Sequence, residues 1–178
     1  MEPDDGAAQS RRTVTIVFCD MVGSTALSER MDAEALRGVL LRYFALLRDC
    51  LERHGGTVEK YIGDAVMAVF GIPVVREDDA LRAARAALDI LAAVEEFNEG
   101  AAGIGDGVRI DVRVGVHTGE VVTSGAADAG HALVSGEVVN VAARLEQHAP
   151  TGQILVGADT HRLIAAAADT EPVAPLTV

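Results

Sequence analysis

Two aspartates are the side chains of this sequence best suited to chemistry. Asp20 ends the apolar run Val14–Cys19, which is typical of a buried strand, and Asp64 follows Gly63 between two β-like runs. The Gly-Asp pair predicts a tight hairpin with the acid at its tip. Alone, an Asp in such a place is more often a turn former or a helix cap. If the two strands are neighbours, however, both carboxylates converge, and such hard oxygen ligands suit one or two divalent cations.

The residues that follow Asp20 predict a loop able to hold a ligand. Gly23 lets backbone approach a ligand closely, and Ser24 or Thr25 is expected to cap a short helix. Free amide groups at such a helix start can hold phosphate. The loop consists of Met21, Val22, Gly23, Ser24 and Thr25.

Two long segments show helical spacing of apolar residues. The first runs from Asp32 to His54 and is stopped by Gly55-Gly56, and the second runs from Asp78 to Asn98. The charged start of the second helix, Arg76 to Asp79, is expected to be solvated. The expected buried stripes are Leu36, Leu40, Phe44, Leu47 and Leu51 in the first helix and Leu81, Ala84, Leu88, Leu91 and Val94 in the second.

The order of elements predicts an α+β fold. A β-α-β-β-α-β order with an extra helix and hairpin suits a ferredoxin-like sandwich. Residues 1–12 predict a disordered tail and residues 13–178 a single domain. The remaining expected strands cover residues 57–62, 65–70, 108–116, 121–124 and 153–156, with a turn at 117–119, a loop at 125–132, and helices at 135–148 and 159–168.

Composition narrows the range of partners. The chain has 178 residues, 49% of them hydrophobic, and a formal net charge of −12. That charge argues against nucleic acid or anionic lipid as the main partner, but a nucleoside triphosphate remains compatible through metal ions and a few placed Lys and Arg. No membrane span or signal peptide is expected, and Cys19 and Cys50 read as buried thiols in a reducing cytosol. The histidines at 54, 117, 131, 148 and 161 show no ligand spacing and are expected at surface or turn positions.

Four segments together resemble a known family. They are FCDMVGST, VEKYIGDAVMAVFG, RVGVHTGEV and SGEVVNVAARLE. Their order and approximate spacing are similar to those of class III nucleotidyl cyclases, the adenylyl and guanylyl cyclase catalytic domains. The resemblance covers roughly Thr13 to Gly157 and is specific because four separate segments agree.

The resemblance implies a role for each matching residue. Asp20 and Asp64 match the two metal-binding aspartates, which hold two Mg²⁺ or Mn²⁺ ions per site. The backbone from Met21 to Thr25 matches the loop that holds the triphosphate. Asn140 and Arg144 match the pair that orients the ribose and stabilises charge at the reacting phosphate.

Base recognition is only half present. Lys60 matches the lysine with which adenylyl cyclases recognise adenine, where guanylyl cyclases usually carry an acid. Leu133 stands where many adenylyl cyclases place an Asp or Thr. The resemblance therefore implies an ATP-preferring but permissive site.

The spacing of two residues supports this reading independently. Asn140 and Arg144 are four apart on a predicted helix and share one face, where an amide can fix a sugar and a guanidinium can meet a phosphate. Taken singly, Asn140 could be a polar surface position, and Arg144 could pair with Glu137 or Glu146. In the family the metals come from one subunit and the Asn-Arg helix from the other, which implies a head-to-tail homodimer that is inactive as a monomer.

Two further departures from the family stand out. Glu120 replaces a basic residue that some members carry, and the sequence stops at Val178, before the Lys-Gly stretch in which a lysine contacts the triphosphate. We therefore expect a catalytic domain truncated at its C-terminal end and attached to regulatory domains outside this chain.

The sequence thus predicts an adenylyl cyclase domain that converts ATP to 3′,5′-cyclic AMP and pyrophosphate. The alternative is a non-catalytic nucleotide-binding or dimerisation module of the same fold. A dinucleotide cyclase, which shares two-metal chemistry, lacks support because no GGDEF-like segment is present.

Overall fold

A computed structural model describes residues 10–100, 109–123 and 136–176. Five strands form one sheet in the order β2-β3-β1-β4-β5, and β1 is antiparallel to both β3 and β4. The strands are β1 Ser10–Val22, β2 Thr57–Ile62, β3 Ala65–Phe70, β4 Asp111–Thr123 and β5 Ile154–Val156. The helices are α1 Ser24–Arg30, α2 Ala33–Arg53, α3 Asp79–Glu99, α4 Glu137–His148 and α5 Ala158–Ile164.

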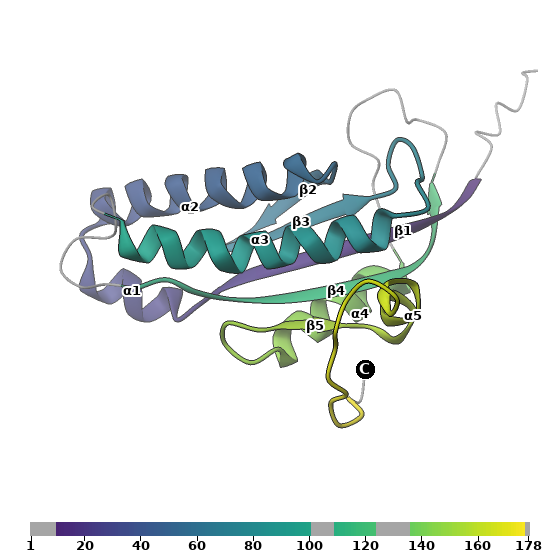
Figure 1. The fold of residues 1–178 in the computed structure, drawn as a ribbon. Coiled ribbons are helices and arrows are strands. Elements are labelled where there is room, and N and C mark those ends of the chain that lie inside the picture. The colour runs from purple at the N-terminus through teal and green to yellow at the C-terminus, as the bar shows by residue number, and fades with distance from the viewer. Residues whose placement is uncertain (1–9, 101–108, 124–135, 177–178) are drawn as a thin grey trace, which may run out of the picture.

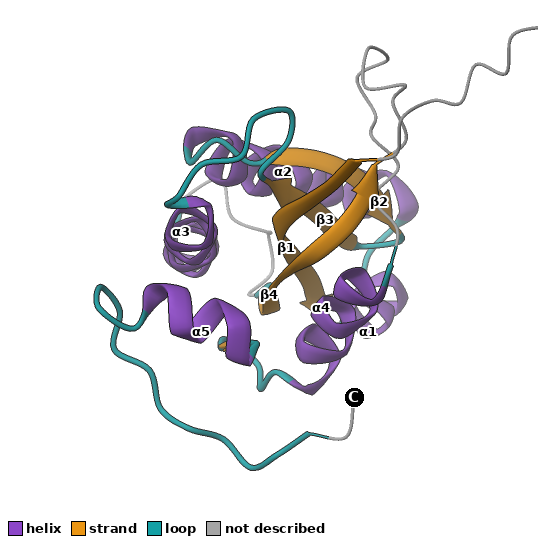
Figure 2. Cartoon of the chain, turned by 90° about the vertical axis from the view of Figure 1, so that its right-hand side faces the viewer, coloured by secondary structure: helices purple, strands orange, loops and turns teal. Residues whose placement is uncertain are grey.

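The strand order confirms the predicted α+β, ferredoxin-like fold. Strands β2-β3-β1-β4 have the order of that sandwich, and β5 adds a strand parallel to β4. Helices α2 and α3 cover one face of the sheet, and α4 packs on the other face (Figures 1 and 2). Because successive strand residues point to opposite faces, β1 and β4 each contribute to both layers.

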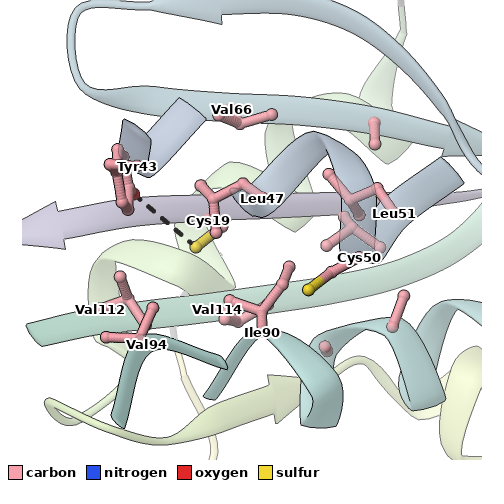
Figure 3. Close-up of a cluster of buried hydrophobic side chains, with 14 of the residues drawn as sticks. Cys19, Tyr43, Leu47, Cys50, Leu51, Val66, Ile90, Val94, Val112 and Val114 are labelled. Atoms are coloured by element: carbon pink, nitrogen blue, oxygen red, sulfur yellow. Dashed lines mark hydrogen bonds between the residues drawn. The ribbon is translucent and has the colours of Figure 1, made fainter. Parts of the chain in front are cut away.

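The larger core lies between the sheet and helices α2 and α3. Leu47 and Leu51 of α2 and Ile90 of α3 pack onto alternate residues of the central strands (Figure 3). Cys19 and Cys50 lie buried in this layer as free thiols, as predicted, and the Cys19 Sγ is 4.0 Å from the Tyr43 hydroxyl. Burial raises the pKa of the Cys19 thiol, so it stays protonated and packs as an apolar group.

Two helix boundaries agree with the sequence reading. The Asp32 side chain accepts hydrogen bonds from the amides of Glu34 and Ala35 and so caps α2. Gly55 has φ 81° directly after α2 and allows the reversal into β2. The hairpin β2–β3 has the predicted bounds, with Gly63 and Asp64 at its tip.

The predicted turn at 117–119 is wrong. Residues 111–123 form one continuous strand, β4, because Thr118 and Gly119 pair with Thr15 and Val14 of β1. Tertiary pairing along the long strand β1 overrides the local turn signal of a His-Thr-Gly sequence. His117 is accordingly half-buried in a strand instead of lying at a turn.

Two smaller expectations also need correction. Leu88, placed in the buried stripe of α3, is 58% exposed, since the small residues Ala83, Ala86 and Ala87 face the sheet instead. Asp79 is buried and forms an ion pair with Arg82, so the start of α3 is not simply solvated.

Near the ends of the described segments, the structure can be compared with the predicted start of the fold and with the predicted loop. Strand β1 begins at Ser10, earlier than the expected start at Thr13. The expected loop at 125–132, His131 and most of the tail lie outside the described residues. None of the described helices combines the length and apolar character that crossing a membrane requires.

Candidate active site

The two predicted metal ligands come together at one end of the sheet. Cys19 pairs with Val66, so Asp20 lies one residue beyond this pair on β1 and Asp64 two residues beyond it at the hairpin tip. The charge of Asp64 is near enough to contribute to the raised pKa of Asp20. The fold thus places both residues at the same end of the sheet, and the role of their carboxylates as metal ligands stays a prediction.

Asp20 lies on the sheet face that α4 covers. It continues the alternate series Val14, Ile16 and Phe18, which forms the apolar layer beneath α4. Its side chain is 18% exposed. Burial, together with the charge of Asp64, raises the pKa of Asp20, and a hydrogen bond from Arg113 opposes that shift.

Arg113 is a member of this site that the sequence reading missed. It lies opposite Asp20 in the β1–β4 ladder and donates a hydrogen bond of 3.0 Å from Nη2 to Oδ2 of Asp20. Its Nε is 2.6 Å from Oε1 of Glu146 on α4, and its Nη1 donates to the carbonyl of Gln147 at 3.3 Å. A signal was available in the sequence, because Arg113 is the one charge within the apolar run 112–116.

Glu146 is the second missed member. Its side chain is 7% exposed, and burial raises the pKa of its carboxyl group, while the charge of Arg113 opposes the shift. The expectation that Arg144 could pair with Glu146 is wrong, because the partner of Glu146 is Arg113. Helix α4 therefore supplies a buried carboxyl group to the end of the sheet where Asp20 lies.

Asn140 and Arg144 lie on the outer surface of α4. Both side chains are exposed, and within the described segments neither makes a hydrogen bond or an ion pair with its side chain. They share one face of the helix, as predicted, whereas Glu146 is buried on the same helix and contacts Arg113.

The backbone after Asp20 leads into a short helix whose first amides have no partner inside that helix. Met21 and Val22 complete β1, and Gly23, with φ 75°, begins α1 without a side-chain cap. The expected capping by Ser24 or Thr25 is therefore wrong, because Gly23 itself takes the cap position. The first bond within the helix runs from the Leu27 amide to the Gly23 carbonyl, so the amides before Leu27 have no partner inside the helix.

Of the two positions expected to recognise the base, Lys60 lies within the described residues and Leu133 does not. Lys60 is exposed on β2, directly after a shift of register between Val58 and Lys60. Such a bulge re-aims the side chains beside it. Leu133 lies outside the described residues.

Comparison with known proteins decides the family. Residues 7–175 match the adenylate and guanylate cyclase catalytic domain. The chain belongs to the class III nucleotidyl cyclases. This confirms the resemblance inferred from the four sequence segments.

Relatives of both specificities resemble this cyclase domain. It is 37% identical over 149 residues to an adenylate cyclase of Anabaena cylindrica, covering 79% of this chain but 28% of that protein. Its fold matches the adenylyl cyclase CyaB from P. aeruginosa with a TM-score of 0.82 and 30% identity, covering 90% of this chain and 84% of that one. A monomeric guanylyl cyclase domain of the RhoGC fusion protein from Blastocladiella emersonii matches with a TM-score of 0.82 and 27% identity, covering 93% and 92%. The relatives with longer chains thus carry sequence beyond this cyclase domain.

The donor set of the cyclase site fits a divalent cation. Across the described residues, no three or more His, Cys, Asp or Glu side chains gather into a ready-made metal cluster. Two neighbouring carboxylates are nevertheless sufficient for Mg²⁺, which is commonly bound by one or two carboxylates together with substrate phosphates. A positive group, the Arg113 guanidinium, already contacts Asp20, so this end of the sheet accommodates a cation.

Proposed function

We propose that this cyclase domain is an adenylyl cyclase that converts ATP to 3′,5′-cyclic AMP and pyrophosphate. The observation that carries the proposal is the convergence of Asp20 and Asp64 at one end of the sheet. Mg²⁺ or Mn²⁺ bound by these carboxylates would neutralise charge on the triphosphate and lower the barrier to attack by the ribose 3′-oxygen.

The chain's own groups then position the substrate. The amides at the start of α1 are offered to phosphate oxygens, since they have no partner inside the helix. Asn140 would orient the ribose through its amide, and Arg144 would stabilise the charge that develops at the reacting phosphate. The 3′-oxygen forms the new ester bond to the α-phosphorus as the bond from that phosphorus to the bridging oxygen breaks, pyrophosphate leaves, and the proton of the 3′-hydroxyl passes to water.

A second copy of the chain completes the site in this proposal. The exposure of Asn140 and Arg144, which have no side-chain partner among the described residues, supports an interface role, because these polar groups are available to a nucleotide held by another subunit. A head-to-tail homodimer would place the Asp pair of one subunit opposite the Asn-Arg helix of the other, twice by symmetry. The attached regulatory domains and a cytoplasmic setting stay predictions.

ATP is the preferred substrate in this proposal because of Lys60. A single hydrogen-bonding side chain often decides which base is rejected, and an ammonium group suits the acceptor nitrogen of adenine. Leu133 offers no hydrogen bond, so we expect measurable turnover of GTP as well.

The test is cyclic AMP production from Mn-ATP by the purified chain over a range of protein concentrations. Activity per chain should rise with concentration below the dimer dissociation constant. Asp20→Asn and Asp64→Asn should each lower it by at least about 100-fold, whereas Asp89→Asn, which removes an acid on α3, should not. ATP binding without any cyclic product would favour the non-catalytic module instead.

Complementation between variants tests the shared site directly. Mixing Asp20→Asn protein with Arg144→Ala protein produces mixed dimers in which one of the two sites carries neither change. The mixture should recover about one quarter of the unmodified activity, since about half of the dimers are mixed and half of their sites are intact. If the mixture is no more active than each variant alone, the site is not built across two subunits.

A further inference from the structure

The guanidinium of Arg113 is held by two carboxylates at once. Its Nη2 contacts Asp20 at 3.0 Å and its Nε contacts Glu146 at 2.6 Å. Burial lowers the pKa of Arg113, but the hydrogen bond with Asp20 and the charge of Glu146 outweigh this, so its pKa lies above the ordinary value. The group therefore stays positively charged beside the proposed metal ligand.

The two contacts are not equivalent. Within the described segments, Arg113 Nε and Glu146 Oε1 have no hydrogen-bond partner, so their close approach is a charge contact, whereas the contact with Asp20 is an aligned hydrogen bond. Glu146 and the Gln147 carbonyl both belong to α4, and together they give Arg113 a second set of partners away from β1.

Glu146 serves the protein poorly as a stability element. Desolvating a buried carboxylate is costly, and the ion pair with Arg113 only offsets that cost. Replacing such a pair with neutral groups is often harmless to stability. The cluster therefore needs an explanation in the chemistry of Asp20.

We propose that Arg113 is a built-in counter-ion of Asp20 that competes with a divalent cation, and that Glu146 is the positioning residue that receives the guanidinium when Asp20 binds the cation. This rests on the metal site of the proposed function. In the nucleotide-free protein the Asp20 oxygen that accepts from Arg113 is occupied, so cation binding is weakened. A divalent ion then binds well only when the phosphates of a nucleotide add their own oxygens.

Binding of Mn²⁺ alone to the nucleotide-free protein tests the proposal, with free Mn²⁺ measured by electron paramagnetic resonance. Arg113→Gln should bind Mn²⁺ at least about tenfold more tightly, since an adjacent opposite charge shifts the affinity of a carboxylate for a proton by a similar factor. Glu146→Gln should bind Mn²⁺ more weakly, because Arg113 then loses Glu146 and keeps Asp20 as its carboxylate partner among the described residues.

The double variant Arg113→Gln/Glu146→Gln distinguishes two explanations of a change in Mn²⁺ affinity. One is competition between Arg113 and Mn²⁺ for the Asp20 carboxylate, and the other is a field effect, the general influence of net charge near the site. The double variant removes one charge of each sign and leaves no buried carboxylate unpaired, so the proposal stays testable even if Arg113→Gln alone fails to fold. Competition for Asp20 predicts tighter Mn²⁺ binding than in the unmodified chain, whereas a field effect predicts no change. Unchanged or weaker binding by the folded double variant would overturn the proposal.

Two controls complete the design. Arg109→Gln removes the same charge from an exposed residue that pairs with Glu95, and it should leave Mn²⁺ affinity within about twofold. Asp20→Asn should abolish the site. If Asp20→Asn does not weaken Mn²⁺ binding, the metal site of the proposed function fails and this inference fails with it. If Asp20→Asn weakens binding while the double variant does not strengthen it, only the inference about Arg113 fails.

Discussion

The backbone of Glu146 on α4 lies directly over Gly115 of β4. A methyl group built on Gly115 would come within 2.9 Å of the Glu146 Cα and would also overlap the Ala142 carbonyl. The absence of a side chain at Gly115 thus sets how deeply α4 sits on the sheet. The close approach of α4 to the sheet in turn places Glu146 against Arg113. It also sets how far Asn140 and Arg144, on the exposed face of α4, lie from the sheet.

Gly115→Ala should therefore damage both the fold and the site. We expect a loss of about 1–3 kcal/mol in the free energy of unfolding, as for an overpacked core position, together with reduced cyclase activity in whatever protein remains folded. Urea unfolding and a cyclic AMP assay measure the two effects.

A second glycine provides the matched control for this substitution. Gly38 lies within α2, and a methyl group there would contact nothing within 4 Å. Gly38→Ala should raise stability by about 0.5–1 kcal/mol. Equal effects of the two substitutions would contradict the close approach of α4 to β4.

Arg144→Ala should separate activity from stability. The side chain is exposed and forms no ion pair within the described residues, so the free energy of unfolding should change by less than about 0.5 kcal/mol. Turnover should fall by about 10²- to 10³-fold, as for the loss of one charge-stabilising donor. Arg85→Ala, on the exposed side of α3, should change neither quantity. A comparable loss of stability and activity in Arg144→Ala would remove the argument for a role at the phosphate.

The sequence predicts most of the fold because its strongest signals are local. The Gly63-Asp64 hairpin and the Gly55-Gly56 stop each rest on two residues whose backbone preferences are decisive. Gly119 carries the same kind of signal, yet it lies inside β4. Its partner is Val14, more than a hundred positions earlier in the chain, and local propensity contains no information about that pairing.

The residues of the candidate site also fall into two groups, those that local sequence signals predict and those that depend on tertiary structure. Asp20 and Asp64 are recognisable because each follows a β-like run, but Arg113 and Glu146 gain their meaning only from their position beside Asp20. Their proximity depends on strand pairing and on the depth of α4, neither of which is written in local spacing. Asn140 and Arg144 share a helix face, as predicted, while the second subunit that would give that face its role stays a proposal.

Lys60→Glu should shift the preference between nucleotides. Lys60 is exposed beside the register shift in β2, and an acid at this position suits the donor groups of guanine. We expect kcat/KM for ATP to fall at least about tenfold and the ratio of GTP to ATP turnover to rise. Arg85→Glu makes the same change of charge on α3 and should leave the ratio unchanged. A uniform loss with both nucleotides would mean that Lys60 does not discriminate between the bases.

His117 should make the stability of the domain sensitive to mild acid. Its ring is half-buried, packs against Gly157, and has no hydrogen-bond partner for Nδ1 within the described segments. Burial lowers the pKa of His117 below its usual 6.5, and the charges of Asp159 on α5 and Glu137 on α4 only partly oppose the shift. Below that pH the unfolded chain binds a proton more readily than the folded one, so stability falls as the pH falls through the window beneath 6.5.

Other titrating groups change the stability in the opposite direction as the pH falls. The effect of His117 is therefore measured by comparing the pH dependence of unfolding between variants. The pKa values of Asp20 and Glu146 are raised, and acidification towards the ordinary carboxyl range therefore favours the folded state at these two residues. The free energy of unfolding in urea, measured from about pH 7.5 to about pH 5, should decline less steeply in His117→Gln than in the unmodified chain. The exposed His161 gives the control, since His161→Gln should keep the original slope. Parallel curves for the unmodified chain and His117→Gln would show that the buried ring is not the source of the acid sensitivity.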